Sequence, residues 1–124
     1  MVMQHKIMLV DDDAHVIDSL SNILNAAGFD VVAVADESTV LEKVRAELPS
    51  LIILDLALPQ VPGLEICKRL KDDVATRHIP VIMLTAKSGD GDKVAGLRLG
   101  ADDYVTKPFN PRELILRINR SLLK

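Results

Sequence analysis

Polar residues that could do chemistry follow four apolar runs of this sequence. They are Asp11, Asp12 and Asp13 after "KIMLV", Asp55 after "LIIL", Thr85 after "VIML", and Thr106 and Lys107 after "YV". A carboxylate that ends an apolar run is either an ordinary turn residue or a reactive group held at the edge of a buried strand. The choice depends on whether the chain brings these side chains together.

Such a set, once brought together, would suit phosphoryl transfer. Asp11, Asp12 and Asp55 in one crevice would raise at least one carboxyl pKa unless a cation joined them. Oxygen ligands without a histidine or cysteine cluster favour Mg²⁺, or Mn²⁺. That ion and Lys107 would bring the local formal charge to about zero. Thr85 would donate a hydrogen bond, and Asp55 would attack phosphorus as the nucleophile.

Five apolar runs rich in branched residues predict strands that are covered on both faces. They are Lys6–Val10, Val31–Val34, Leu51–Leu54, Val81–Leu84 and the shorter Tyr104–Val105. Helical spacing of apolar residues lies between and after these runs, at Ile17, Leu20, Leu24 and Ala27; Val40, Val44 and Leu48; Ile66 and Leu70; Val94, Leu97 and Ala101; and Leu114, Ile118 and Leu122. Gly28 and Gly100 predict helix ends, and Pro111 predicts a first helical turn.

Five strand–helix units in this order predict an α/β protein, a flavodoxin-like (βα)5 three-layer sandwich. Its parallel five-stranded sheet would take the strand order 2-1-3-4-5. Ligands bind such folds at the carboxyl ends of the strands, beside the switch point between strands 1 and 3. The candidate residues would therefore converge on one rim, whereas Asp36 and Glu37, which follow the edge strand, would lie apart.

Each candidate also has an ordinary interpretation when it is taken alone. Asp13 is expected to cap the helix that follows it, as aspartates before helices commonly do. A lone Thr85 is a typical turn or cap residue, and a lone Lys107 is a surface lysine whose backbone is confined by Pro108. These ordinary interpretations do not explain why such residues follow four different predicted strands.

Composition narrows the class of protein. The 124 residues suit a single domain, residues 1–124. Fifteen basic against eighteen acidic residues leave a formal charge of −3, which does not favour nucleic acid or a membrane surface as a partner. No apolar run approaches the roughly 18 residues of a membrane helix, and acidic residues come too early for a signal peptide. We therefore expect a cytoplasmic protein with one buried, unreactive thiol, Cys67.

Four longer motifs, "KIMLVDDD", "LIILDLALP", "PVIMLTA" and "GADDYVTKPF", span the chain in this order. Together they resemble the receiver domain of bacterial two-component response regulators. The resemblance implies that Asp55 is the phosphoacceptor, and that the donor is a sensor histidine kinase or a phosphotransfer protein. The chain would then catalyse only its own phosphorylation and dephosphorylation and would be no enzyme in the usual sense.

The resemblance also assigns the roles of the residues around Asp55. Asp11 and Asp12 would hold Mg²⁺ together with the backbone carbonyl of Ala57. Thr85 and Lys107 would bind the phosphoryl oxygens. The peptide bond between Lys107 and the proline after it is expected to be cis.

The family resemblance further implies an output surface. Thr85 would move toward the phosphoryl group and Tyr104, the aromatic switch, would turn inward. This movement would remodel the surface formed by the fourth helix, the fifth strand and the fifth helix, which here carries Lys93, Asp102, Asp103, Glu113 and Arg117. Such a charge pattern resembles the dimer face of winged-helix transcriptional response regulators. We therefore expect a homodimer through this surface when the protein is phosphorylated, and no direct contact of the domain with nucleic acid.

Two stretches are unusual. The fourth helix is expected to be marginal, because Gly96 lies in its interior and its apolar stripe is the poorest of the five. In "PQVPG", Pro62 stands before Gly63 where the family usually has an Asp-Gly or similar pair. That position is no ligand, so we expect the chemistry to survive with a stiffer start of the third helix.

Two other functions stay open at this point. Asp11 and Asp13 form a D-x-D pattern after the first strand, as in small aspartate-nucleophile phosphatases. Those enzymes are longer and carry a further acidic motif where this chain has "VTKPF". The third interpretation is an unphosphorylated interaction module on the same fold.

Overall fold

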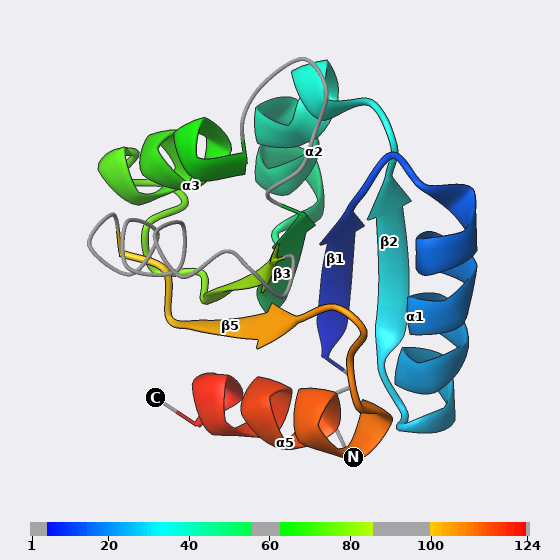
Figure 1. Cartoon of the computed structure of the whole chain (residues 1–124). Coiled ribbons are helices and arrows are strands. Elements are labelled where there is room, and N and C mark those ends of the chain that lie inside the picture. The colour runs from blue at the N-terminus through cyan, green and yellow to red at the C-terminus, as the bar shows by residue number, and fades with distance from the viewer. Residues whose placement is uncertain (1–4, 56–62, 86–99, 124) are drawn as a thin grey trace.

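The computed structural model describes residues 5–55, 63–85 and 100–123. Within these ranges the elements follow in the order β1 (Lys6–Val10), α1 (Ala14–Ala26), β2 (Asp30–Val34), the 3-10 helix η1 (Glu37–Thr39), α2 (Val40–Glu47), β3 (Leu51–Asp55), α3 (Gly63–Asp72), β4 (Val81–Thr85), β5 (Asp103–Thr106) and α5 (Pro111–Leu122) (Figure 1). All five predicted strands are present, and each end lies within one residue of its predicted position. The fourth predicted helix and Pro62 lie outside the described residues.

The five strands form one parallel sheet in the order β2-β1-β3-β4-β5, as predicted. Val10 at the end of β1 lies opposite Val34 of β2 and Leu54 of β3. Thr85 at the end of β4 lies opposite Thr106 of β5. The strands therefore end at a common edge, and the polar residues that follow them meet there.

Helices cover both faces of the sheet, which makes a three-layer sandwich (Figure 1). Buried leucines of α1 pack with Leu114 and Ile118 of α5 on one face. Residues of α2 and α3 pack on the other, where Cys67 is fully buried and its burial raises the pKa of the thiol. Coverage on both sides explains why β1, β3 and β4 read as continuous apolar runs rather than alternating ones.

Local sequence determines where two of the helices begin. The Asp13 carboxylate accepts hydrogen bonds from the backbone N–H groups of His15 and Val16, at 2.9 and 3.4 Å, so it caps α1 as predicted. Asn110 caps α5 in the same way, and Pro111 is the first helical residue. Both caps lie in the loops at the carboxyl edge of the sheet, next to the candidate residues.

Three described residues of the predicted helical stripes lie outside helices. Ala27 directly follows α1 as its C-cap residue. Leu48 follows α2 with a φ of 45° and is 62% exposed. Ala101 comes after Gly100, whose φ is 102°, and is buried in the core under α3. Our predictions extended the helical period beyond the point at which the backbone leaves the helix or turns. None of the described helices is long and apolar enough to cross a bilayer.

Candidate functional site

Three carboxylates meet where β1 and β3 end. Asp55 is the last residue of β3, and Asp11 directly follows the neighbouring strand β1. One oxygen from each of Asp11, Asp12 and Asp55 lies within 4.8 Å of the others. Asp11 and Asp55 are buried, whereas Asp12 is exposed. We call these three residues, together with Lys107, the carboxylate rim.

Asp11 is held in a fixed orientation but is not fully satisfied. The backbone N–H of Asp13 donates to Asp11 Oδ1 at 2.9 Å. The other oxygen, Oδ2, is buried and accepts no hydrogen bond from the described residues. Burial raises the pKa of Asp11 above its ordinary value, and the negative charge of Asp55 adds to the rise, while the Asp13 N–H and Lys107 oppose it.

Lys107 brings a positive charge to the rim from β5. Its Nζ lies 3.4 Å from Asp55 Oδ1 and 3.7 Å from Asp11 Oδ2. Its backbone N–H donates to the Thr85 carbonyl oxygen at 2.8 Å, which joins the chain after β5 to the end of β4. The peptide bond between Lys107 and Pro108 is cis, as expected.

Thr85 and Tyr104 lie on the two strands beyond Asp55. Thr85 is the last residue of β4 and is buried. Because Leu84 lies opposite Asp55, Thr85 stands one residue closer to the edge of the sheet. Tyr104 lies in β5 and packs against the core under α2 and α3. The predicted candidates in the described ranges therefore do follow neighbouring strand ends.

The donors at the rim fit a hard divalent cation. Buried carboxylate oxygens are nearly always hydrogen-bonded, so Oδ2 of Asp11, which has only the Lys107 ammonium 3.7 Å away and no hydrogen bond from the described residues, favours a ligand there. The cluster offers carboxylate oxygens, which Mg²⁺ and Mn²⁺ prefer. Asp36 follows β2 at the edge of the sheet and bonds with Ser38 instead, as its predicted separation from the rim implies. Ala57, the expected carbonyl ligand, lies outside the described residues.

Comparison with known families identifies the chain. Residues 7–119 match the response regulator receiver domain. The chain belongs to this family. Receiver domains are signalling domains and generally bind Mg²⁺ through acidic residues. The family therefore agrees with the charge and ligand chemistry of the rim.

Curated relatives of this receiver domain are transcription regulators. The chain is 44% identical over 120 residues to the alkaline phosphatase synthesis transcriptional regulatory protein PhoP of Bacillus subtilis, covering 97% of this chain and 49% of that protein. It is 42% identical to the DNA-binding response regulator MtrA of Mycobacterium tuberculosis H37Rv, covering 97% of this chain and 51% of that protein. The chain thus spans about half the length of the curated relatives it matches.

Solved structures agree with the receiver fold. A crystal structure from Chloroflexus aurantiacus J-10-fl has a TM-score of 0.94 at 36% identity, and the match covers 98% of this chain and 100% of that one. A CheY-like response regulator receiver domain protein from Methanospirillum hungatei JF-1 has a TM-score of 0.89 at 32% identity, with 97% and 94% covered. None of these relatives supports the phosphatase alternative.

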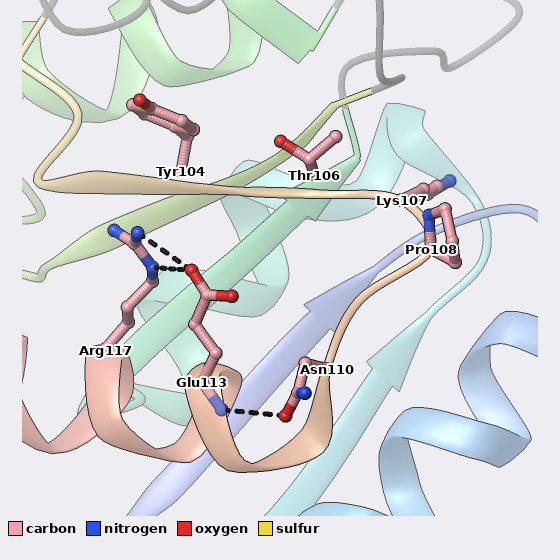
Figure 2. A pocket seen from close by; sticks show the side chains of 7 residues that line it. All are labelled: Tyr104, Thr106, Lys107, Pro108, Asn110, Glu113 and Arg117. Atoms are coloured by element: carbon pink, nitrogen blue, oxygen red, sulfur yellow. Dashed lines mark hydrogen bonds and ion pairs between the residues drawn. The ribbon is translucent and has the colours of Figure 1, made fainter.

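Next to the rim, the receiver domain has a hollow between β5 and α5 (Figure 2). Its volume is about 270 Å³, and its lining residues are Tyr104, Thr106, Lys107, Pro108, Asn110, Glu113 and Arg117. Lys107 belongs to both the rim and this hollow.

Arg117 joins β5 to α5 beside this hollow. Its guanidinium donates to Asp103 at 2.6 Å and to Glu113, one helical turn earlier, at 2.9 Å (Figure 2 draws the bond to Glu113). The guanidinium carbon lies 5.8 Å from the centroid of the Tyr104 ring. Three charges of the predicted output surface are thus paired with one another within the chain.

Asp102 does not belong to that charged surface, contrary to our expectation. Its carboxylate accepts a hydrogen bond from the Val81 N–H at 2.9 Å and lies 3.4 Å from Lys71 Nζ of α3. Successive residues of an extended chain point to opposite faces of a sheet, so Asp102 turns toward α3 and Asp103 toward α5. Lys93, the remaining predicted charge, lies outside the described residues.

The sequence patterns did not single out Lys71. Its side chain is only 14% exposed, and its Nζ also donates to the carbonyl oxygens of Arg77 and Ile79, at 3.1 and 2.7 Å. A signal was present, because Lys71 lies one turn after the buried Cys67 and so continues the buried stripe of α3. A lysine on a buried stripe is expected to have an acceptor inside the protein for its ammonium group.

Proposed function

We propose that residues 1–124 form one receiver domain that accepts a phosphoryl group on Asp55. The donor would be the phosphohistidine of a sensor histidine kinase or of a phosphotransfer protein. The observation that carries the proposal is the carboxylate rim. Among the described residues, three carboxylates cluster there, Lys107 lies near two of them, Asp11 and Asp55, and one buried oxygen of Asp11 accepts no hydrogen bond. Such a surplus of negative charge is unfavourable in a purely structural site, and a divalent cation with a phosphoryl group would use it.

Asp11 and Asp12 would hold Mg²⁺, or Mn²⁺, with the backbone carbonyl of Ala57. The bound ion supplies positive charge opposite the phosphoryl oxygens. Asp11, which is buried and held by the Asp13 N–H, would be the fixed ligand. Asp12, which is exposed, leaves the site accessible to a phosphodonor from solvent.

Asp55 would supply the nucleophile. Its oxygen forms the bond to phosphorus while the bond from phosphorus to the donor's imidazole nitrogen breaks, and the imidazole leaves with the electron pair. Lys107, 3.4 Å from Asp55, and the hydroxyl of Thr85 would donate hydrogen bonds to the phosphoryl oxygens. The domain thereby catalyses only its own phosphorylation and dephosphorylation and turns over no metabolite.

The phosphorylated domain would signal through the surface of the fourth helix, β5 and α5. Thr85 would move toward the phosphoryl group and Tyr104 would turn inward. Arg117 lies over the Tyr104 ring and pairs with Asp103 and Glu113. Movement of Tyr104 would therefore change the position of Arg117 and the affinity of this surface for a second copy of the domain. A cytoplasmic homodimer that controls transcription, without itself touching DNA, agrees with the DNA-binding and transcriptional relatives.

Intact-mass spectrometry tests the proposal. The protein is incubated with a small acyl phosphate, with Mg²⁺ and in a parallel sample with a chelator. We expect the mass of one phosphoryl group to appear only with Mg²⁺. Asp55→Asn, which keeps the shape of the side chain and loses its charge, should gain none.

Two controls make the result specific. Asp36→Asn removes an acidic residue from a loop at the same edge of the sheet, beside the edge strand, and we expect it to be phosphorylated like the unchanged protein. If Asp55→Asn gains the phosphoryl mass as readily, the assignment of the nucleophile is wrong. If no sample gains it, the proposed function itself is wrong.

A further inference from the structure

We propose that Lys71 is a positioning residue for the carboxylate rim. Through its ion pair with Asp102 it would hold the start of β5, and with it Lys107, which follows the same strand. The inference rests on the proposed function, because it takes Lys107 as the group that binds phosphoryl oxygens. It thereby gives α3, whose C-terminal end carries Lys71, a role in phosphoryl binding at the opposite edge of the sheet.

The ammonium group of Lys71 is committed to one internal site. It lies 2.7 Å from the Ile79 carbonyl oxygen, 3.1 Å from that of Arg77 and 3.4 Å from the Asp102 carboxylate. A lysine has three N–H donors, so these contacts can use all of them. The contacts tie the end of α3 to the connection before β4 and to the residue before β5.

Asp102 in turn sets how β5 pairs with β4. Its backbone N–H donates to the Val81 carbonyl oxygen at 2.9 Å, and its carboxylate accepts from the Val81 N–H at 2.9 Å. At the far end of β5, the Lys107 N–H donates to the Thr85 carbonyl oxygen at 2.8 Å. The strand of only four residues is thus joined to β4 at both ends.

Loss of the Lys71 charge would weaken the first of these two attachments of β5 to β4. The side chain of Asp102 is 24% exposed, and a largely buried carboxylate without a cation is strongly disfavoured, so it would turn toward water. Its bond to the Val81 N–H would then be lost. The pair of Arg117 with Asp103 ties β5 to α5 and does not replace the pairing with β4.

The chain before β5 is built around the Lys71 side chain. At Gly100 a Cβ atom would lie 3.1 Å from Lys71 Cγ and 3.5 Å from its Cβ. A glycine here lets the backbone approach the aliphatic part of the lysine, while the ammonium reaches Asp102 two residues later. Lys71 therefore supports the approach to β5 by packing as well as by charge.

The experiment separates binding of the metal from binding of a phosphoryl mimic. Mg²⁺ affinity is measured by titration, and beryllium fluoride, which imitates a phosphoryl group on a carboxylate, is then titrated at saturating Mg²⁺. In Lys71→Met we expect unchanged Mg²⁺ affinity and at least about tenfold weaker binding of beryllium fluoride, since a small displacement of Lys107 weakens contacts that only the phosphoryl group makes. Lys71→Arg should restore most of the loss.

Lys68→Met is the matched control. Lys68 lies on the same helix and pairs with Asp72 on the exposed side, so its loss should change neither affinity. A merely structural role of Lys71 would lower the melting temperature and leave the beryllium fluoride affinity of the folded protein unchanged. That result would overturn the inference.

The remaining outcomes are also decisive. If Lys71→Met weakens Mg²⁺ and beryllium fluoride alike, Lys71 supports the site in general and the inference is wrong. If the unchanged protein binds no beryllium fluoride, the proposed function fails instead. Should Lys71→Met not fold, Asp102→Ala removes both the ion pair and the acceptor of the Val81 N–H bond, and we expect the same split between the two affinities.

Discussion

The two edges of the sheet handle charge in opposite ways. At the amino-terminal edge, where helices return to the next strand, three acidic groups have cations of their own: Glu47 with Lys6 at 2.9 Å, Asp73 with Arg45 at 2.6 Å, and Asp102 with Lys71 at 3.4 Å. At the carboxyl-terminal edge, among the described residues, three carboxylates cluster, and Asp11 and Asp55 share Lys107 at 3.7 and 3.4 Å. The first edge is balanced and the second carries surplus negative charge.

This difference separates stability from function. A fold gains nothing from a buried carboxylate oxygen without a hydrogen bond, such as Oδ2 of Asp11, and would be more stable without it. Such an arrangement is useful where an ion or a reacting group must be bound. The imbalance at one edge therefore indicates the reaction site, and the balance at the other indicates the part that holds β4 and β5 in place.

The largest expected effect comes from removing a buried charge at the rim. We expect Asp11→Asn to lower Mg²⁺ affinity by at least about a hundredfold, because a direct ligand contributes more than the groups around it. Without metal, the variant should unfold at a higher temperature than the unchanged protein, since one of the clustered charges is gone. Calorimetric titration and thermal unfolding with and without Mg²⁺ measure both effects.

Asp73→Asn is the counterpart at the other edge. It removes the partner of Arg45, so the variant should melt at a lower temperature and bind Mg²⁺ normally. If both variants change stability in the same direction without metal, the contrast between the edges is wrong.

The next largest effect concerns Gly100 at the balanced edge. Gly100→Ala places a side chain at a φ of 102° and a Cβ 3.1 Å from Lys71 Cγ, so we expect about 1–2 kcal/mol of destabilisation in urea unfolding. Gly28→Ala has a similar φ of 91° but open space around the new atom. A loss in Gly28→Ala as large as in Gly100→Ala would mean that crowding of Lys71 contributes nothing.

The pH dependence of stability should have opposite signs at the two edges. The pKa of Asp11 is raised in the folded protein, mainly by burial, so in a chelator its contribution to stability falls as pH rises from about 3.9, the unfolded value, through the raised pKa. The pKa of Glu47 is lowered by its hydrogen bond with Lys6. Its contribution is therefore complete above about 4.3 and is lost as pH falls through the lowered pKa.

Two variants isolate these contributions. Asp11→Asn should remove the fall in unfolding free energy with rising pH, and Glu47→Gln should remove part of the fall on acidification. Denaturant unfolding across the acidic range measures both slopes. Changes of the same sign in the two variants would contradict the proposed contrast.

The smallest expected effect is at Leu48, which ends α2 at the balanced edge. Its φ of 45° is unfavourable for leucine, and the side chain is 62% exposed, so little packing would be lost on replacement. We expect Leu48→Asn to stabilise the protein by about 0.5 kcal/mol, because asparagine tolerates left-handed backbone better. Leu48→Ala keeps the unfavourable backbone and should give no gain in urea unfolding.

Much of the fold could be predicted because its signals are local. Consecutive branched apolar residues were enough to predict the buried strands that begin at Lys6 and Leu51. Asp13 and Pro111 predicted helix starts because their effect is on the backbone next to them. The rim followed from these strands, since parallel strands end at one edge. The partners of Asp102 could not be predicted, because a charged side chain next to a strand can point to either face of the sheet.

By itself, the sequence determined the order of strands and helices, the residues at each strand end and hence the set that could meet around Asp55. These depend on backbone preferences and apolar periodicity, which neighbouring residues specify. Only the tertiary structure decided that Oδ2 of Asp11 is buried without a hydrogen bond and that Lys71 holds Asp102. Both facts arise from packing between segments that are distant in sequence. Burial makes a polar group without a partner unfavourable and strengthens the interaction of a group that has one.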